Sequence, residues 1–365
     1  MQTVLAFVIV LGVLIFVHEL GHFVTAKLAG IAVPRFSIGL GPKVWGFTIG
    51  ETEYVISALP LGGYVKMAGM GEEEALEKLE GGKSELEVPP ERRFDSKPIG
   101  TRAVVISAGV IMNFLFAVVA FAGLAYYNSP APIIGEVSED WPAAEAGIEP
   151  GDRILAVDGE EVTTWNEFVG AVQDRPGESA QLRIRRDGRE IQLTTDIARF
   201  DTVVTNPATG ADTALSLGRV GLTLDTDNPV RGLGLPEAMS LGVTRTGELS
   251  WLILEFLGDV VTGQASARDI GGPVLIGQMS GQAARAGAAA FIAFMAILSV
   301  HLAVLNLLPI PILDGGHLVF LGIEAVRGRA LSLEARARMS QVGFILIMAL
   351  MVWAFTADFL RIFGG

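Results

Sequence analysis

The stretch His18-Glu19-Leu20-Gly21-His22 lies at the end of an apolar run that starts near the N-terminus. On an α-helix, positions i and i+4 share one face, so both imidazoles can bind one metal ion with the carboxylate of Glu19 beside it. An H-E-x-x-H sequence is typical of zinc sites that activate water. Because the residues before the motif are apolar enough for lipid, the sequence predicts a hydrolytic site with one zinc ion inside a membrane.

Composition supports a membrane location. The 365 residues are 50% hydrophobic and 18% charged, whereas about 25% of residues are charged in ordinary soluble proteins. The formal net charge of −13 argues against a nucleic-acid partner, because nucleic-acid binding favours basic surfaces. The chain has no cysteine, so a metal ion must bind His and carboxylate groups.

Four apolar stretches approach the ~20 residues that cross a bilayer, and they are residues 3–28, 103–127, 288–323 and 342–359. The third is too long for one simple helix and is interrupted by Pro309 and Pro311. Basic clusters precede the second stretch and separate the third from the fourth, which predicts that these flanks are cytoplasmic. Both termini and the long segment between the second and third stretches are then expected outside.

A β-hairpin is predicted soon after the metal-binding motif. Residues 47–57 alternate like two strands around a Gly50-Glu51 turn, and an apolar loop containing Gly62 and Gly63 follows, so that hairpin and loop cover about 44–70. Strand edges cannot be exposed to lipid. The hairpin is therefore expected at the interface or beside a polar cavity, where a substrate could pair near Tyr54 or the two glycines. A cytoplasmic hairpin without contact to the site is the alternative.

Residues 143–159 resemble the core of a PDZ domain. They combine a short helix that ends at Gly147, a Pro-Gly-Asp turn, a strand and an Asp-Gly turn. Residues 165–172 predict the longer helix of such a domain, and residues 180–195 predict a hairpin. The strand at 133–137 is expected to receive a peptide on its edge. Whether the groove binds a carboxyl terminus or the domain excludes bulky proteins remains open.

The boundaries expected from these patterns divide the chain into four parts. An N-terminal membrane part covers 1–127, a PDZ domain covers 128–200, and a C-terminal membrane part covers 288–365. Residues 201–287 are expected to form a linker and, at 235–262, an amphipathic helix on the outer membrane surface.

A third metal ligand is needed, because catalytic zinc usually has three protein ligands and a water. The chain has only four histidines. Asp314 lies in the interrupted third stretch, where a carboxylate is costly unless it is paired or bound to metal, and we expect it to be the third ligand. His317 is an alternative ligand or a hydrogen-bonding partner, whereas His301 is expected to pack or to donate a hydrogen bond.

These elements together resemble the site-2 protease family of intramembrane zinc metalloproteases, most of all its bacterial PDZ-bearing branch, which includes the regulator of sigma-E protease. The resemblance covers nearly the whole chain: the H-E-x-x-H motif, residues 306–315, and the domain between them. Residues 61–66 resemble the membrane-reentrant β-loop of that family, and residues 107–113 resemble its Gly-x-x-x-Asn element. Val110 stands where proline is frequent, and a second PDZ domain is missing.

The resemblance implies a polytopic α-helical membrane protein with about four transmembrane helices, a membrane-associated β-hairpin and one inserted α+β PDZ domain. It implies an inner-membrane endopeptidase for regulated intramembrane proteolysis of single-pass proteins, such as anti-sigma factors or remnant signal peptides, after a first extracytoplasmic cut. The PDZ domain would be periplasmic and the site near the cytoplasmic side. By position, zinc would bind His18, His22 and Asp314, Glu19 would activate water, and Asn306 and Asn113 would help to position the substrate.

Two other classes of function are compatible with parts of the sequence. A non-catalytic membrane PDZ scaffold would hold a structural metal with four protein ligands and no open position. A zinc transporter would need further carboxylates or histidines along its spans, and the sequence offers few. Neither class explains why Glu19 adjoins His18.

Overall fold

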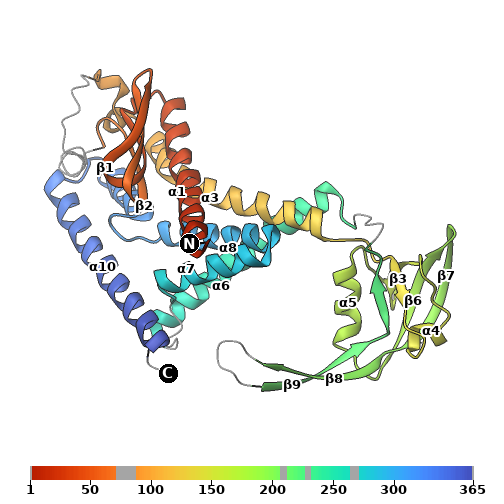
Figure 1. The fold of residues 1–365 in the computed structure, drawn as a ribbon. Coiled ribbons are helices and arrows are strands. Elements are labelled where there is room, and N and C mark those ends of the chain that lie inside the picture. The colour runs from red at the N-terminus through yellow and green to blue at the C-terminus, as the bar shows by residue number, and fades with distance from the viewer. Residues whose placement is uncertain (1, 71–87, 206–211, 227–231, 264–270, 364–365) are drawn as a thin grey trace. The chain divides into compact units, whose positions relative to one another are not determined.

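The computed structural model describes residues 2–70, 88–205, 212–226, 232–263 and 271–363 (Figure 1). The chain divides into two compact units. The first combines Met1–Phe121 with Val243–Gly365 and is called the helical unit below. The second is Ala122–Gly242 and is called the inserted unit. Each unit has its own hydrophobic core.

Within the described residues, four helices are long and apolar enough to cross a membrane. Apolar side chains on them stay exposed in the protein alone, as Val4 and Leu5 do on the first, which is the pattern of a helix that faces lipid. The count agrees with the sequence prediction. The bounds are α1 (Gln2–Leu28), α3 (Ile99–Asn128), α8 (Ala288–Asn306) and α10 (Leu333–Phe363).

The third predicted span is broken where its prolines predict a break. Helix α8 ends at Asn306, and α9 (Asp314–Arg327) begins after a loop that contains Pro309 and Pro311. Proline lacks the N–H that continues a helix. The long helix expected at 235–262 is present as α6 (Leu235–Thr262). A second helix, α7 (Pro273–Ala286), lies within the segment expected to be a linker, so that expectation was incomplete.

The predicted hairpin is larger than expected and forms a folded sheet. Its strands are β1 (Arg35–Ile49) and β2 (Thr52–Lys66). Residues 35–38 pair with both the first part of β2 and its last part, residues 63–66. The prediction of a loop after Ser57 was wrong, because Val65 and Phe36 share a buried cluster that holds this stretch in the sheet. Short 3-10 turns follow at Pro90–Arg92 and Phe94–Ser96.

The inserted unit contains the elements that the sequence predicted for residues 143–195. Its main sheet has the order β5-β4-β6-β7, and Ile154, Leu182 and Ile184 are fully buried in its core. A capping box between Thr164 and Glu167 begins the longer helix. The bounds are β3 (Ile134–Val137), α4 (Pro142–Glu145), β4 (Arg153–Val157), β5 (Glu160–Glu161), α5 (Trp165–Gln173), β6 (Ser179–Arg186) and β7 (Arg189–Asp196).

One expectation for this unit differs from the structure, and a second is narrowed by it. The region after residue 200, expected as a tail or linker, forms β8 (Ala198–Thr205), β9 (Asp212–Arg219) and β10 (Leu222–Leu224). The last of these pairs with β3, and Ile133 bridges Arg153 on the other side. One edge of this strand is therefore covered by β10, and the prediction that a peptide binds at residues 133–137 stays a prediction for the other edge.

Candidate metal centre

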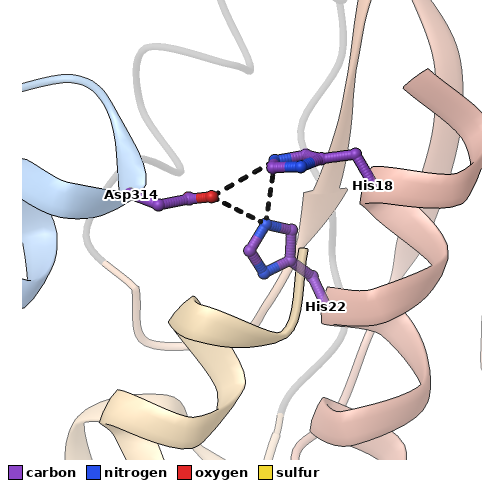
Figure 2. A group of neighbouring side chains, drawn as sticks. All are labelled: His18, His22 and Asp314. Carbon is purple, nitrogen blue, oxygen red and sulfur yellow. Dashed lines mark hydrogen bonds and ion pairs between the residues drawn. The ribbon is translucent and has the colours of Figure 1, made fainter. Parts of the chain in front are cut away.

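Helix α1 and the N-terminus of α9 bring three potential ligands together (Figure 2). His18 and His22 lie one turn apart, and their Nε2 atoms are 3.3 Å from each other. The Oδ2 atom of Asp314 is 3.2 Å from Nε2 of His18 and 3.4 Å from Nε2 of His22. All three side chains are largely buried. The residues predicted from scattered positions in the sequence thus form one compact triangle.

The dimensions of this triangle fit a tetrahedral zinc ion. With bonds of about 2.0–2.1 Å to nitrogen and oxygen, tetrahedral ligand atoms are about 3.3–3.4 Å apart. The atoms of His18, His22 and Asp314 are separated by 3.2 to 3.4 Å. The Asp314 Oδ2 atom is buried and, among the described residues, makes no hydrogen bond of ordinary geometry, and a buried carboxylate oxygen needs a counter-charge. A metal ion would satisfy that need.

A tight loop turns Asp314 toward the imidazoles. A Cβ atom at Gly315 would lie 2.2 Å from the carbonyl oxygen of Leu307, and one at Gly316 would lie 2.3 Å from that of Ile310. Only glycine at these two positions lets the start of α9 pack this closely against the preceding loop. Ile312, two residues before the carboxylate, has a φ of 98°, which is strained for a β-branched residue. The strained backbone at Ile312 is part of the loop that places the Asp314 carboxylate beside the two imidazoles.

Helices α1 and α3 approach closely beside the ligands because glycines face the contact. A Cβ atom at Gly21 would lie 2.3 Å from the carbonyl oxygen of Ala108, and one at Gly109 would lie 2.3 Å from Nε2 of His22. Small residues of this kind let helix backbones pack directly. The imidazoles therefore lie against the backbone of α3.

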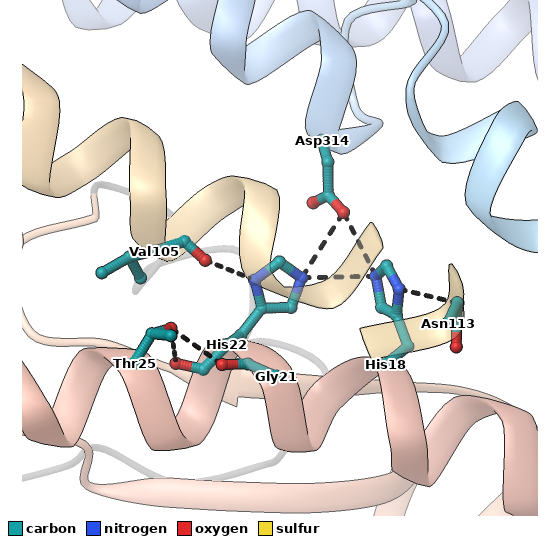
Figure 3. A network of polar contacts seen from close by, with 7 residues as sticks. All are labelled: His18, Gly21, His22, Thr25, Val105, Asn113 and Asp314. Atoms are coloured by element: carbon teal, nitrogen blue, oxygen red, sulfur yellow. Dashed lines mark hydrogen bonds and ion pairs between the residues drawn. The ribbon is translucent and has the colours of Figure 1, made fainter. Parts of the chain in front are cut away.

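Each imidazole also has a partner on α3 through its Nδ1 atom (Figure 3). His22 Nδ1 donates to the carbonyl oxygen of Val105 at 2.9 Å. His18 Nδ1 lies 3.1 Å from Nδ2 of Asn113, and Asn113 is fully buried. On α1 itself, the Thr25 hydroxyl donates to the carbonyl oxygens of Gly21 and His22. Contacts with α3 thus fix the orientations of both imidazole rings.

A cavity of about 380 Å³ opens beside the triangle. Glu19 lies in its wall with the three potential ligands. The predicted residues Gly62, Gly63, Asn306 and His317 also line it. The cavity therefore combines the carboxylate of Glu19, the three potential metal ligands and the end of the β2 strand.

The other candidate residues from the sequence lie outside this cavity. Tyr54 packs among aromatic rings, stacking on Phe47 at 5.3 Å between centroids, and it is not part of the cavity lining. Asn113 faces His18 instead of the cavity. His301 donates from Nδ1 to the carbonyl oxygen of Ile297 in its own helix at 2.9 Å, as expected. No sequence pattern could have identified Val105, because a backbone carbonyl can belong to any residue type.

Charged groups join the hairpin turn to its surroundings. Glu51 accepts hydrogen bonds from Arg92 at 2.8 Å and from Lys27 at 2.6 Å. The Arg92 hydrogen bond, together with Lys27 and against the effect of partial burial, holds the pKa of the Glu51 carboxyl below its usual value. Lys27 belongs to the last turn of α1, so these ion pairs link the sheet to the helix that carries both histidines.

Comparison with known proteins places the chain in a family. The model of Peptidase family M50 matches residues 6–350. The chain is 37% identical to the Atu1380 protein of Agrobacterium fabrum, over 99% of this chain and 96% of the relative. It is 33% identical to the zinc metalloprotease RasP of Bacillus licheniformis, over all of both chains, and 32% identical to the regulator of sigma-W protease RasP of Bacillus subtilis, over 99% of each.

Among solved structures, the PDZ domain of an SdrC-like protein from Listeria innocua matches with 16% identity and a TM-score of 0.20, covering 27% of this chain and 99% of that domain. The M50 match and the relatives carry the assignment, since each spans nearly the whole chain. The family is the site-2 protease type of metalloendopeptidase, and its members use zinc. The chain belongs to Peptidase family M50.

Proposed function

We propose that this protein is a zinc-dependent intramembrane endopeptidase that cleaves single-pass membrane proteins after a first cut outside the membrane. The observation that carries the proposal is the triangle of His18, His22 and Asp314 in the wall of a cavity that also contains Glu19. Relatives include a regulator of sigma-W protease, which makes anti-sigma factors the favoured substrates and remnant signal peptides the next class.

Each residue has a role that follows from its position. His18, His22 and Asp314 would hold the ion with one position open. When bound, zinc supplies Lewis-acid polarisation of the scissile carbonyl and of the attacking water. Glu19 accepts the proton of that water and delivers it to the leaving amine, which is the work of a general base and then a general acid. A structural metal would not need a carboxylate beside an open position, which is where Glu19 lies.

A substrate helix must become extended before its peptide bond can be attacked. Residues 63–66 pair with residues 35–38, and within the described residues they have no strand on their other side. Gly63 begins this stretch, Gly62 precedes it, and both line the cavity. A Cβ atom at Gly63 would lie 3.0 Å from Cγ of Glu19, so this strand end is adjacent to the base. We infer that the substrate adds here as a further strand, with Asn306 contacting it.

The membrane arrangement is part of the proposal. Four apolar helices and basic flanks such as Arg92 and Arg336 favour a multi-pass protein of a bacterial inner membrane. The inserted unit would then be periplasmic, and the cavity would lie toward the cytoplasmic side.

We further propose that the inserted unit is a PDZ domain that binds an extended peptide. A cavity of about 420 Å³ lies between α5 and residues 217–223, lined by Trp165, Phe168 and Val172. Within the described residues, β10 has a partner strand on one side only. An unpaired strand edge next to an apolar pocket suits strand addition by a peptide end. A purely steric filter would not require this pocket.

The direct test is cleavage of a single-pass substrate by the purified protein in liposomes. We expect the wild type to cut a substrate with a trimmed ectodomain, and Glu19→Gln to be about 10²–10⁴-fold slower, the usual contribution of general acid–base catalysis. Glu160→Gln, which alters an exposed carboxylate of β5, is the matched control and should cut normally. Equal rates for Glu19→Gln and wild type would overturn the proposal.

A further inference from the structure

One face of α3 lies against the two imidazoles of the candidate centre. Val105, Gly109 and Asn113 are spaced four residues apart, which places them on the same side of the helix. Val105 contributes its carbonyl oxygen to His22, and Asn113 contributes its amide to His18. A Cβ atom at Gly109 would lie 2.8 Å from Cε1 of His18 and 2.3 Å from Nε2 of His22. The missing side chain at Gly109 lets both imidazoles contact the helix, and the residues on either side of it contact one Nδ1 atom each.

The proposed zinc site fixes the tautomer of each imidazole. In both residues Nε2 faces Asp314, so Nε2 would give its lone pair to the metal and Nδ1 would carry the proton. A ligating histidine then needs an acceptor for its Nδ1–H, which orients the ring and increases its basicity. For His22 that acceptor is the carbonyl oxygen of Val105.

For His18 the acceptor must come from the Asn113 side chain. The amide nitrogen faces Nδ1 of His18 at 3.1 Å, while Oδ1 of Asn113 is buried and has no hydrogen-bond partner in the described part of the chain. That orientation serves a metal-free imidazole, whose Nδ1 accepts a hydrogen bond. Once Nδ1 carries the proton, two donors would face each other, and a half-turn of the amide places Oδ1 there instead.

We propose that Asn113 is a positioning residue for zinc, whose Oδ1 atom accepts the Nδ1–H of His18 and holds that ring toward the metal. This inference rests on the proposed ligation by His18, and it replaces the substrate-binding role expected from the sequence. The carbonyl oxygen of Asn113 accepts a separate hydrogen bond from the Ser299 hydroxyl at 2.9 Å, which ties α3 to α8. Positioning and helix packing therefore use different atoms and can be separated.

Three variants make that separation. Asn113→Leu keeps the size of the side chain and removes the acceptor. Asn113→Asp keeps an oxygen acceptor at the same reach. Ser299→Ala removes the buried contact to the Asn113 backbone and leaves the amide in place. Loss of an outer acceptor of this kind typically weakens metal binding 10–100-fold.

The experiment measures zinc affinity of the full-length protein in detergent by competition with a chelator, with the absorption spectrum of the cobalt-substituted protein as a second readout. We expect Asn113→Leu to bind zinc 10–100-fold more weakly with an altered cobalt spectrum. We expect Asn113→Asp and Ser299→Ala to stay within about threefold of wild type. At saturating zinc, Asn113→Leu should show the wild-type KM, because it does not contact the substrate.

Three outcomes would overturn the inference. Wild-type affinity in Asn113→Leu would show that His18 needs no acceptor there. Equal weakening in the Leu and Asp variants, or in Ser299→Ala, would assign Asn113 to packing. A raised KM of Asn113→Leu at saturating zinc would show that Asn113 contacts the substrate. His18→Ala is measured in parallel, and normal zinc binding in that variant would instead contradict the proposed ligand set.

Discussion

Two buried aspartates, one in each unit, show how differently the same side chain can be used. In the inserted unit, Asp152 is 1% exposed and accepts hydrogen bonds from Arg186 through both carboxylate oxygens, at 2.8 and 2.7 Å. The backbone N–H of Glu149 donates to it as well, at 2.9 Å. Its charge and its lone pairs are satisfied by the fold itself.

In the described part of the helical unit, Asp314 has no arginine or backbone N–H that pairs with Oδ2 in this way. Its Oδ2 atom is buried and faces the Nε2 atoms of His18 and His22. These two contacts, at 3.2 and 3.4 Å, are longer than those that Arg186 makes with Asp152, and a buried carboxylate needs a close counter-charge. Both aspartates are buried, so burial alone does not distinguish them. The partners do: those of Asp152 satisfy its charge, whereas those of Asp314 leave a place for a cation.

The largest expected effect comes from removing the carboxylate of the helical unit. Asp314→Ala would leave two protein ligands, so zinc should be lost on dialysis and cleavage should fall at least about 10³-fold, since a metal contributes several kcal/mol to the transition state. Zinc content and cleavage are measured on the same preparation. Retention of one zinc with normal activity would remove Asp314 from the site.

The counterpart, Asp152→Ala, should act on stability alone. It would leave Arg186 without its buried partner and cost about 2–3 kcal/mol in the inserted unit. Hydrogen exchange of the β4 and β6 amides in the full chain reports this cost. Zinc content should not change, and a loss of zinc in this variant would contradict the distinction between the two aspartates.

A smaller effect is expected from filling the space at Gly109. The added methyl group of Gly109→Ala would meet both imidazoles, and we expect zinc to bind about 10–100-fold more weakly, as for other changes to the surroundings of metal ligands. Gly123→Ala on the same helix is the matched control, because nothing lies within 4 Å of its Cβ position. Competition with a chelator measures both, and equal affinities would refute the close approach of α3.

The smallest effect concerns a carboxylate with partly exposed partners. The pKa of Glu51 is lowered in the folded protein, chiefly by Arg92, so its contribution to stability is complete above its ordinary pKa and is lost as the pH falls through the folded value. We expect about 0.5 kcal/mol, because such pairs are screened by solvent. The protection factors of the amides at the hairpin turn, which correct for the intrinsic pH dependence of exchange, should fall in acid in wild type. In Glu51→Gln this acid-dependent part should disappear, and an unchanged pH dependence would be inconsistent with the ion pairs.

Much of this organisation could be predicted from the sequence. The apolar helices follow from hydropathy, and Asp314 followed from the scarcity of histidine and the absence of cysteine. The continuation of β2 past Gly63 could not be predicted, because a Gly-rich stretch stays extended only through its pairing with residues 35–38. The position of Asn113 beside His18 depends on the packing of α3 against Gly21, and such a contact between distant segments leaves no local pattern.

The most direct test of the central claim is X-ray absorption spectroscopy of the zinc-loaded protein. The account predicts one zinc with four nitrogen or oxygen ligands at about 2.0–2.1 Å, of which two are imidazoles, and the loss of the zinc from His22→Ala, which keeps only two protein ligands. A site with three or four imidazoles, which would recruit His301 or His317, would contradict it, because zinc would then have a different ligand set from His18, His22 and Asp314.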